Sequence, residues 1–173
     1  MPIRTGWEGR FLEDLSVGDI YRHPLGRTIS ESDNTWFTLL TLNTNEAHFN
    51  AHAAADSVFG KPIVNSALTI AIVLGMSVTD TSYNAFANLG IDGLVLTTPV
   101  YIGDTIYAES LVLGSRESKS RPYGGIVEVK TRGLNQDGDI IMRFKRRFFV
   151  HKRDSEYRKS SFPEPSTPID SDD

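Results

Sequence analysis

The stretch VNSALTIAIVLGMSVTD (Val64–Asp80) decides the fold, since almost every residue in it is apolar or small. It is too short to span a bilayer, which takes about 20 apolar residues. It is long enough for several helical turns. A helix that is apolar on nearly all sides is typical of a protein core. The sequence therefore predicts a central helix that is buried on most of its circumference.

After this stretch the pattern changes to β-branched and alternating segments, which indicate strands. We expect them at LVLTTPV (94–100), TIYAESLVLGSRES (105–118), GIVEVKTRGLNQ (125–136) and DIIMRFKRRFFVHKR (139–153). The clearest hairpin turn is Gln136–Gly138. One apolar helix followed by a long antiparallel meander predicts an α+β domain in which a sheet wraps the helix. Edge strands of such a sheet favour pairing with a second copy, so we expect a homodimer or a larger homo-oligomer.

The region before the central helix carries shorter signals. Ser30 and Asp33 form a capping box in all but the length of the acid, and the apolar residues that follow predict a helix over SESDNTWFTLLTL (30–42). NAHAAADSVFG (50–60) is a second helical piece. We assign residues 1–153 to a single domain and expect the polar, proline-rich segment 154–173 to be disordered.

Composition narrows the class of protein. The chain has 173 residues, of which 39% are hydrophobic and 23% charged, as expected for one globular core. A formal net charge of −4 does not favour nucleic-acid binding. No apolar run suits a membrane span or a signal peptide, and the absence of cysteine fits a reducing cytoplasm.

The decapeptide TLNTNEAHFN (41–50) is the first candidate for chemistry. It gathers two amides, Asn43 and Asn45, a carboxylate, Glu46, and an imidazole, His48, in a short run. Both asparagines could equally cap or bend the chain after a helix. His52 could share a helical face with His48 as a metal pair, but no third ligand lies at a suitable spacing, so we expect no metal site.

Four segments in order resemble landmarks of the MaoC-like, or hydratase-2, branch of the hot-dog fold superfamily. They are GRTISESD (26–33), TLNTNEAHFN (41–50), FGKPIVNSALT (59–69) and PVYIGDTIYAES (99–110). The resemblance covers roughly residues 11–153. It implies a hot-dog fold and an (R)-specific enoyl-CoA hydratase or 3-hydroxyacyl-CoA dehydratase, with coenzyme A entering as part of the substrate and no other cofactor. NTN, VNSALT and SRESKSRP are similar to the branch that acts on mesaconyl-CoA or itaconyl-CoA.

The resemblance also implies roles for individual residues. His48 and Asn45 match the family signature, whereas Asn43 stands where the family has an aspartate. An amide can orient water but cannot take a proton at neutral pH, so the base role falls to His48. Glu46 is a possible substitute carboxylate. Ser66 stands at the family glycine whose N–H meets the thioester oxygen.

Two further positions belong to the predicted substrate site. Asn65 stands where the family often has histidine, and Arg121 could meet a substrate carboxylate or the phosphates of coenzyme A. RFKRR (143–147) predicts a strand with a basic exposed face, a weaker candidate for the same contact. Two alternative functions stay open, a hot-dog acyl-CoA thioesterase and a non-catalytic acyl-CoA binding subunit.

Overall fold

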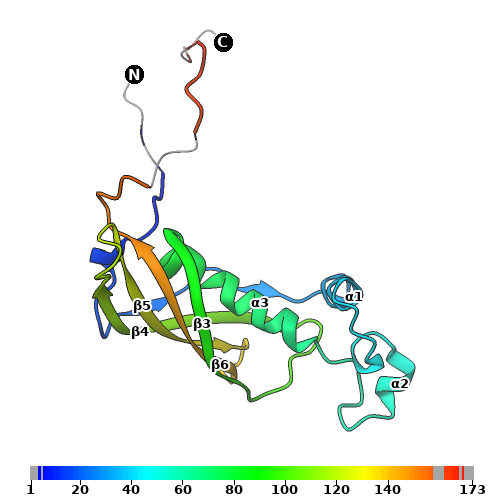
Figure 1. Cartoon of the computed structure of the whole chain (residues 1–173). Coiled ribbons are helices and arrows are strands. Elements are labelled where there is room, and N and C mark those ends of the chain that lie inside the picture. Colours follow the sequence, from blue (N-terminus) through cyan, green and yellow to red (C-terminus); the bar gives the residue numbers. More distant parts are fainter. Residues whose placement is uncertain (1–3, 5, 158–161, 168, 170–173) are drawn as a thin grey trace.

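Helix α3 (Ser66–Met76) lies along one face of an antiparallel sheet (Figure 1). The computed structural model describes residues 4, 6–157, 162–167 and 169. Parts of the segment predicted to be disordered, 158–161, 168 and 170–173, lie outside the described residues, so that expectation stays a prediction. Among the described residues, no helix has both the length and the apolar character needed to cross a membrane.

The sheet is antiparallel, and its strands run in the order β1-β4-β5-β6-β3, with β2 also paired to β4. The strands are β1 (Ile20–Arg22), β2 (Arg27–Thr28), β3 (Ala85–Leu96), β4 (Thr105–Glu117), β5 (Gly124–Leu134) and β6 (Ile140–His151). Alternate residues of β4, β5 and β6 face α3, as period-2 patterning requires. The predicted α+β architecture, with a sheet around a central helix, is confirmed.

The core lies between α3 and this sheet. Val73 of α3 is fully buried among Ile106, Phe144 and other apolar side chains of the central strands. Gly133 on β5 lets the helix approach closely, because a Cβ there would lie 2.7 Å from Val73 Cγ2. Burying a valine or isoleucine side chain of this kind stabilises a fold by about 1.5–3 kcal/mol.

Two predicted elements have different bounds in the structure. The central helix was predicted to reach Asp80, but α3 ends at Met76 and a π-helical turn, η3 (Val78–Ser82), follows. The strand predicted over 94–100 is wrong in its position, since β3 spans Ala85–Leu96. Pro99 has no N–H for a ladder, and register shifts along β3 break the alternation that would mark its earlier part as a strand.

The helical pieces before α3 form an overhang that projects beyond the start of α3 (Figure 1). It consists of α1 (Glu31–Leu40), η2 (Glu46–His48) and α2 (Ala51–Ala55), and a single turn, η1 (Leu12–Asp14), lies earlier in the chain. The capping box is confirmed, since Asp33 N donates to Ser30 Oγ at 3.1 Å and Ser30 N donates to Asp33 Oδ2 at 2.8 Å.

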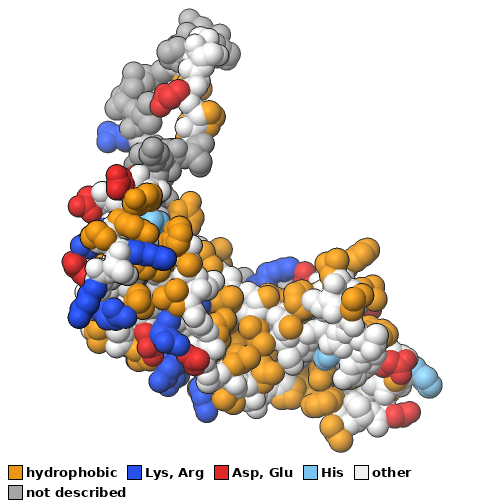
Figure 2. All heavy atoms as spheres, in the orientation of Figure 1, with side chains coloured by type: hydrophobic (Ala, Val, Ile, Leu, Met, Phe, Trp, Pro, Cys, Tyr) orange, Lys and Arg blue, Asp and Glu red, His pale blue; other side chains and the backbone are white. Residues whose placement is uncertain are grey.

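The basic run of β6 divides between the two faces of the sheet. Arg143, Lys145 and Arg147 lie on the outer face, where Figure 2 shows several basic side chains. Arg146 faces the core and is only 2% exposed. The expectation of a basic exposed face is therefore right for three positions and wrong for Arg146, which occupies the inward place between Phe144 and Phe148.

Candidate active site

His48 is buried, and its ring is held by the segment that leads into α3. Its Nδ1 lies 3.0 Å from the carbonyl oxygen of Ile63. A carbonyl can only accept a hydrogen bond, so Nδ1 carries the proton in the neutral ring. Nε2 then holds the free lone pair, and it makes no hydrogen bond to any described residue. His48 is thus set in the tautomer that a general base at Nε2 requires.

Asn34 of α1 joins this histidine to the start of α3. Its Nδ2 donates to the carbonyl oxygens of His48, at 2.7 Å, and of Ile63, at 3.3 Å. Its Oδ1 accepts the N–H of Asn65 at 2.8 Å. Asn34 is fully buried, and these three bonds satisfy its amide. The sequence analysis missed it, although an asparagine followed four residues later by Thr38, also fully buried, is a polar stripe inside a helix.

The first turn of α3 leaves the N–H of its first residue, Ser66, free. Asn65 caps the helix by accepting the N–H of Ala67 at 2.9 Å, and its own N–H is bonded to Asn34. The N–H of Ser66, between them, has no hydrogen-bond partner among the described residues. Free N–H groups and a partial positive charge at a helix start favour a developing negative charge. The N–H of Ser66 is therefore a donor to which an oxyanion could bind.

A cavity of about 270 Å³ opens beside this donor. Its lining residues are Phe59, Ile63, Val64, Ser66, Thr69, Leu96, Thr97, Thr98, Pro99 and Val100. His48 is not one of the lining residues. Its ring is hydrogen-bonded to the carbonyl oxygen of Ile63, which is one of them. The lining has no Asp or Glu side chain, so this cavity offers a thioester an N–H donor and hydroxyls but no carboxylate nucleophile.

The other predicted residues of the decapeptide have local roles in the structure. Asn43 Oδ1 accepts the N–H of Asn45 at 3.0 Å, and Asn45 Oδ1 accepts the N–H of Ala47 at 3.1 Å, so both asparagines shape the turn into η2. Glu46 is exposed, and its Oε1 accepts a hydrogen bond from the Asn50 side chain at 3.0 Å. The structure brings His48, Asn65 and Ser66 together. Asn43, Asn45 and Glu46 instead support the turn that carries His48.

Arg121 lies at the opposite end of the sheet, in the connection between β4 and β5. Its guanidinium carbon is 5.9 Å from the ring centroid of Phe86 and 5.9 Å from that of Phe149. Within one copy of the chain, it is therefore not part of the His48 and Ser66 site. Its predicted contact with a substrate carboxylate or with the phosphates of coenzyme A stays a prediction.

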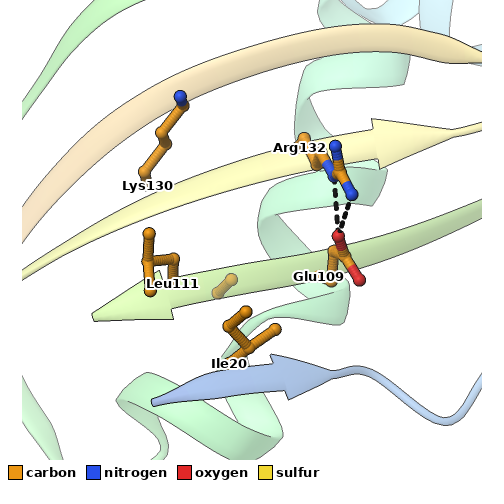
Figure 3. A pocket seen from close by; sticks show the side chains of 6 residues that line it. Ile20, Glu109, Leu111, Lys130 and Arg132 are labelled. Carbon is orange, nitrogen blue, oxygen red and sulfur yellow. Dashed lines mark hydrogen bonds and ion pairs between the residues drawn. The ribbon is translucent and has the colours of Figure 1, made fainter. Parts of the chain in front are cut away.

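A second cavity, of about 180 Å³, lies on the outer face of the sheet, away from α3 (Figure 3). Arg132 Nε donates to Glu109 Oε1 at 2.6 Å. Burial alone would raise the pKa of Glu109, but hydrogen bonds and charge from Arg132 and Arg22 lower it below the usual value. Glu109 therefore stays ionised, and its charge is balanced by the two arginines. The cavity is not a candidate for acid–base chemistry.

A second buried histidine, also missed in the sequence, belongs to a structural network. His23 Nδ1 lies 2.9 Å from Asp80 Oδ2, and its Nε2 lies 2.9 Å from Ser110 Oγ. Ser110 is 1% exposed and also bonded to Thr131, so its hydroxyl is not available as a nucleophile. No three His, Asp or Glu side chains in the described part of the chain gather in a way that would hold a metal ion.

Known proteins share the arrangement of helix and sheet described above. The chain is 34% identical over 160 residues to the mesaconyl-CoA hydratase of Cereibacter sphaeroides, which covers 92% of this chain and 46% of that protein. A solved structure of a putative MaoC domain protein dehydratase from Chloroflexus aurantiacus superposes with a TM-score of 0.83 and 31% identity, over 96% of this chain and 47% of the other. A Mycobacterium tuberculosis protein with a double hot-dog fold superposes with a TM-score of 0.77 at 18% identity, over 92% of this chain and 53% of the other.

These likenesses also set a limit. The chain spans less than half the length of the mesaconyl-CoA hydratases and of the β-methylmalyl-CoA dehydratase to which it is similar. The family match nevertheless runs over residues 3–161, and so takes in the sheet, α3 and the turn that holds His48. The helix-wrapping sheet is the hot-dog fold, and the chain belongs to the mesaconyl-CoA hydratase family.

Proposed function

We propose that this chain reversibly adds water to the double bond of a 2-enoyl-CoA, as a hydro-lyase of the (R)-specific type. The observation that carries the proposal is the unpaired N–H of Ser66 at the start of α3, beside a cavity whose Ile63 carbonyl fixes the tautomer of His48. This pairing supplies the two things that hydration of an unsaturated thioester needs, a base and a donor for the enolate-like oxygen.

In this mechanism His48 Nε2 takes one proton from a water molecule as the water oxygen bonds to the β-carbon. Electrons of the double bond move toward the thioester, and negative charge collects on its oxygen at the N–H of Ser66. The His48 imidazolium then returns the proton to the α-carbon on the same face, which regenerates the neutral ring. Dehydration is the same path in reverse.

We propose a branched C4 to C5 dicarboxylyl-CoA, such as mesaconyl-CoA or itaconyl-CoA, as the substrate. The names of the relatives support this choice, among them mesaconyl-CoA hydratases and a β-methylmalyl-CoA dehydratase. A cytoplasmic setting stays a prediction, which rests on the absence of cysteine from the sequence.

A second copy of the chain completes the active unit in this proposal. β3 is an edge strand whose exposed side chains are largely apolar, including Phe86, Leu89, Ile91, Leu94 and Leu96. Hydrophobic side chains also gather over the overhang (Figure 2), where Trp36 is 66% exposed and Leu40 is 78% exposed. Apolar patches next to an unpaired strand favour association. The double hot-dog neighbour, of which this chain covers 53%, supports a unit built from two such folds.

A substrate panel tests the activity. Loss of enoyl absorbance is followed with crotonyl-CoA, mesaconyl-CoA and itaconyl-CoA, beside an assay for free thiol. We expect absorbance loss without thiol release. Thiol release without hydration identifies a thioesterase instead. No reaction in either assay, together with tight binding of coenzyme A, identifies a binding subunit.

A further inference from the structure

Arg146 is the largest fully buried side chain among the described residues. Its Nη2 donates to three hydroxyls, those of Ser77 at 3.2 Å, Thr81 at 3.2 Å and Ser82 at 2.8 Å. The guanidinium carbon lies 4.9 Å from the ring centroid of Phe148. Its Nε is buried without a hydrogen-bond partner. Within the described ranges, no carboxylate forms an ion pair with it.

A buried arginine without a carboxylate partner is energetically unfavourable. Burial lowers the pKa of Arg146 to about 10, so the side chain still carries its charge at neutral pH. A buried charge is costly unless it is paired, and the three hydroxyl groups accept hydrogen bonds only from Nη2 and carry no opposite charge. Because Nη2 already donates to three hydroxyls, the remaining donors of the guanidinium could meet a carboxylate through a charge-assisted hydrogen bond.

A cavity of about 200 Å³ borders Arg146. It is lined by Val78, Ser82, Ala85, Phe86, Ala87, Asn88 and Arg146. The lining mixes apolar side chains with the polar groups of Ser82 and Asn88, and it has one cation and no acid. This chemistry suits a short carbon chain that ends in a carboxylate.

Within one copy, the cavity at Arg146 is too far from Ser66 to share a substrate with it. Ser66 begins α3, whereas Ser77, which contacts Arg146, follows its last residue. Eleven residues of α-helix measure about 16 Å. A C4 to C5 acyl chain is much shorter than this distance.

Pairing of two copies along β3 removes that separation. Antiparallel pairing of two full-length β3 strands about a twofold axis places Ala85 of one copy opposite Leu96 of the other. Ala85 lines the cavity at Arg146, and Leu96 lines the cavity at Ser66. The twofold axis therefore brings the cavity at Arg146 of each copy against the cavity at Ser66 of the partner subunit. This happens once at each end of the strand pair.

We infer that Arg146 binds the free carboxylate of a dicarboxylyl-CoA whose thioester is held at Ser66 of the partner subunit. The inference rests on the proposed function, and it adds a subsite that selects dicarboxylyl over monocarboxylyl chains. It also makes each site a product of two copies of the chain.

Binding of two unreactive thioesters tests the subsite without any turnover. Succinyl-CoA carries a terminal carboxylate where butyryl-CoA carries a methyl group. We expect the wild-type chain to bind succinyl-CoA roughly 10- to 100-fold more tightly, as a charge-assisted hydrogen bond would give. Arg146→Met should bring the ratio near one by weakening succinyl-CoA alone. Arg147→Met, at the neighbouring exposed arginine, should keep the wild-type ratio.

Several results would overturn the inference. Equal binding of the two thioesters by the wild-type chain does so whether or not the chain hydrates anything, and so does a wild-type ratio in Arg146→Met. If Arg146→Met does not fold, Arg146→Lys takes its place and should lower the ratio at least threefold, since lysine lacks the planar fork. An unchanged ratio in that folded variant also refutes it. A preserved succinyl-CoA preference without hydration of any enoyl-CoA removes the proposed activity and leaves the subsite standing.

Mixed dimers test the contribution across the interface. His48→Ala and Arg146→Met chains, each with little activity on mesaconyl-CoA alone, are combined through two affinity tags. If Arg146 serves the partner's site, one of the two sites in the mixed dimer has both native residues, and about half of wild-type turnover returns. If both residues act in the same copy, each site keeps one defect and no activity returns, which overturns the assignment across the interface.

Discussion

His48 Nδ1 and the carbonyl oxygen of Ile63 lie 3.0 Å apart, and this contact leaves Nε2 as the nitrogen that can accept a proton. Ile63 itself lines the cavity beside Ser66. The segment that orients His48 therefore also forms a wall of the cavity beside Ser66. Asn34 holds both carbonyls of this arrangement from α1, so three segments fix the position of the ring.

His48→Ala should lower kcat for the best enoyl-CoA by about 10²- to 10⁴-fold, the range of a lost general base. The fold should remain, as judged by circular dichroism and thermal unfolding. His52→Ala is the matched control, because His52 is an exposed histidine on the adjacent helix α2. Full activity in a folded His48→Ala chain would refute the mechanism.

Glu46→Gln should change turnover by no more than about twofold, since Glu46 is exposed and bonded to Asn50. Asn43→Ala should cost more, roughly tenfold, because it removes the hydrogen bond that closes the turn before His48. The comparison is made from kcat/KM values with one substrate. The reverse order would assign the base role to Glu46.

Asn34→Ala should lower the free energy of unfolding by at least about 2 kcal/mol, as it leaves the N–H of Asn65 and the carbonyl oxygen of His48 buried without this partner. Urea unfolding measures the difference. Ser32→Ala, at an exposed position of the same helix, should stay within about 0.5 kcal/mol of the wild type. Equal stability of the two variants would show that the Asn34 bonds contribute little.

Acid should weaken the start of α1 in a predictable pH range. The Ser30 backbone N–H, then the Ser30 hydroxyl and Arg27, lower the pKa of Asp33 below 3.8. A carboxyl whose pKa is lower in the folded state adds stability above its unfolded pKa and loses it as the pH falls through the folded value. Urea unfolding of wild type and Asp33→Asn should thus differ most at neutral pH and converge as the pH falls below the folded-state pKa of Asp33. A difference that grows in acid would contradict this linkage.

The sequence could predict the fold because its main signals are local and agree with one another. An all-round apolar helix, period-2 strands and a capping box at Ser30 each need only neighbouring residues to be read. The start of β3 could not be predicted, since its bulges break the alternation of apolar and polar residues. Its exposed apolar residues do not mark one face of the strand as buried. The burial of Arg146 could not be predicted, because three exposed cations lie close to it in the same run and only Arg146 faces inward.

The site was predictable only in part, for a similar reason. His48, Asn65 and Ser66 were suggested by the resemblance to the MaoC-like family, whose landmarks occur in the same order along this chain. Asn34 acts through contacts with residues 14 and 31 positions away, which no spacing rule reveals. The turn-forming use of the Asn43 amide likewise depends on the conformation of the loop, so residue type alone suggested a water ligand.

Ser66→Pro tests the central claim most directly. Proline suits the first position of a helix, and the backbone of Asn65, with φ −56° and ψ 125°, suits the residue before proline. The substitution removes the one N–H assigned to the oxyanion, whereas Ser66→Ala keeps it. The measurement is kcat for mesaconyl-CoA hydration in the two variants. We predict a loss of about 10²- to 10³-fold in Ser66→Pro and near wild-type turnover in Ser66→Ala; equal kcat values in two folded variants would contradict the account.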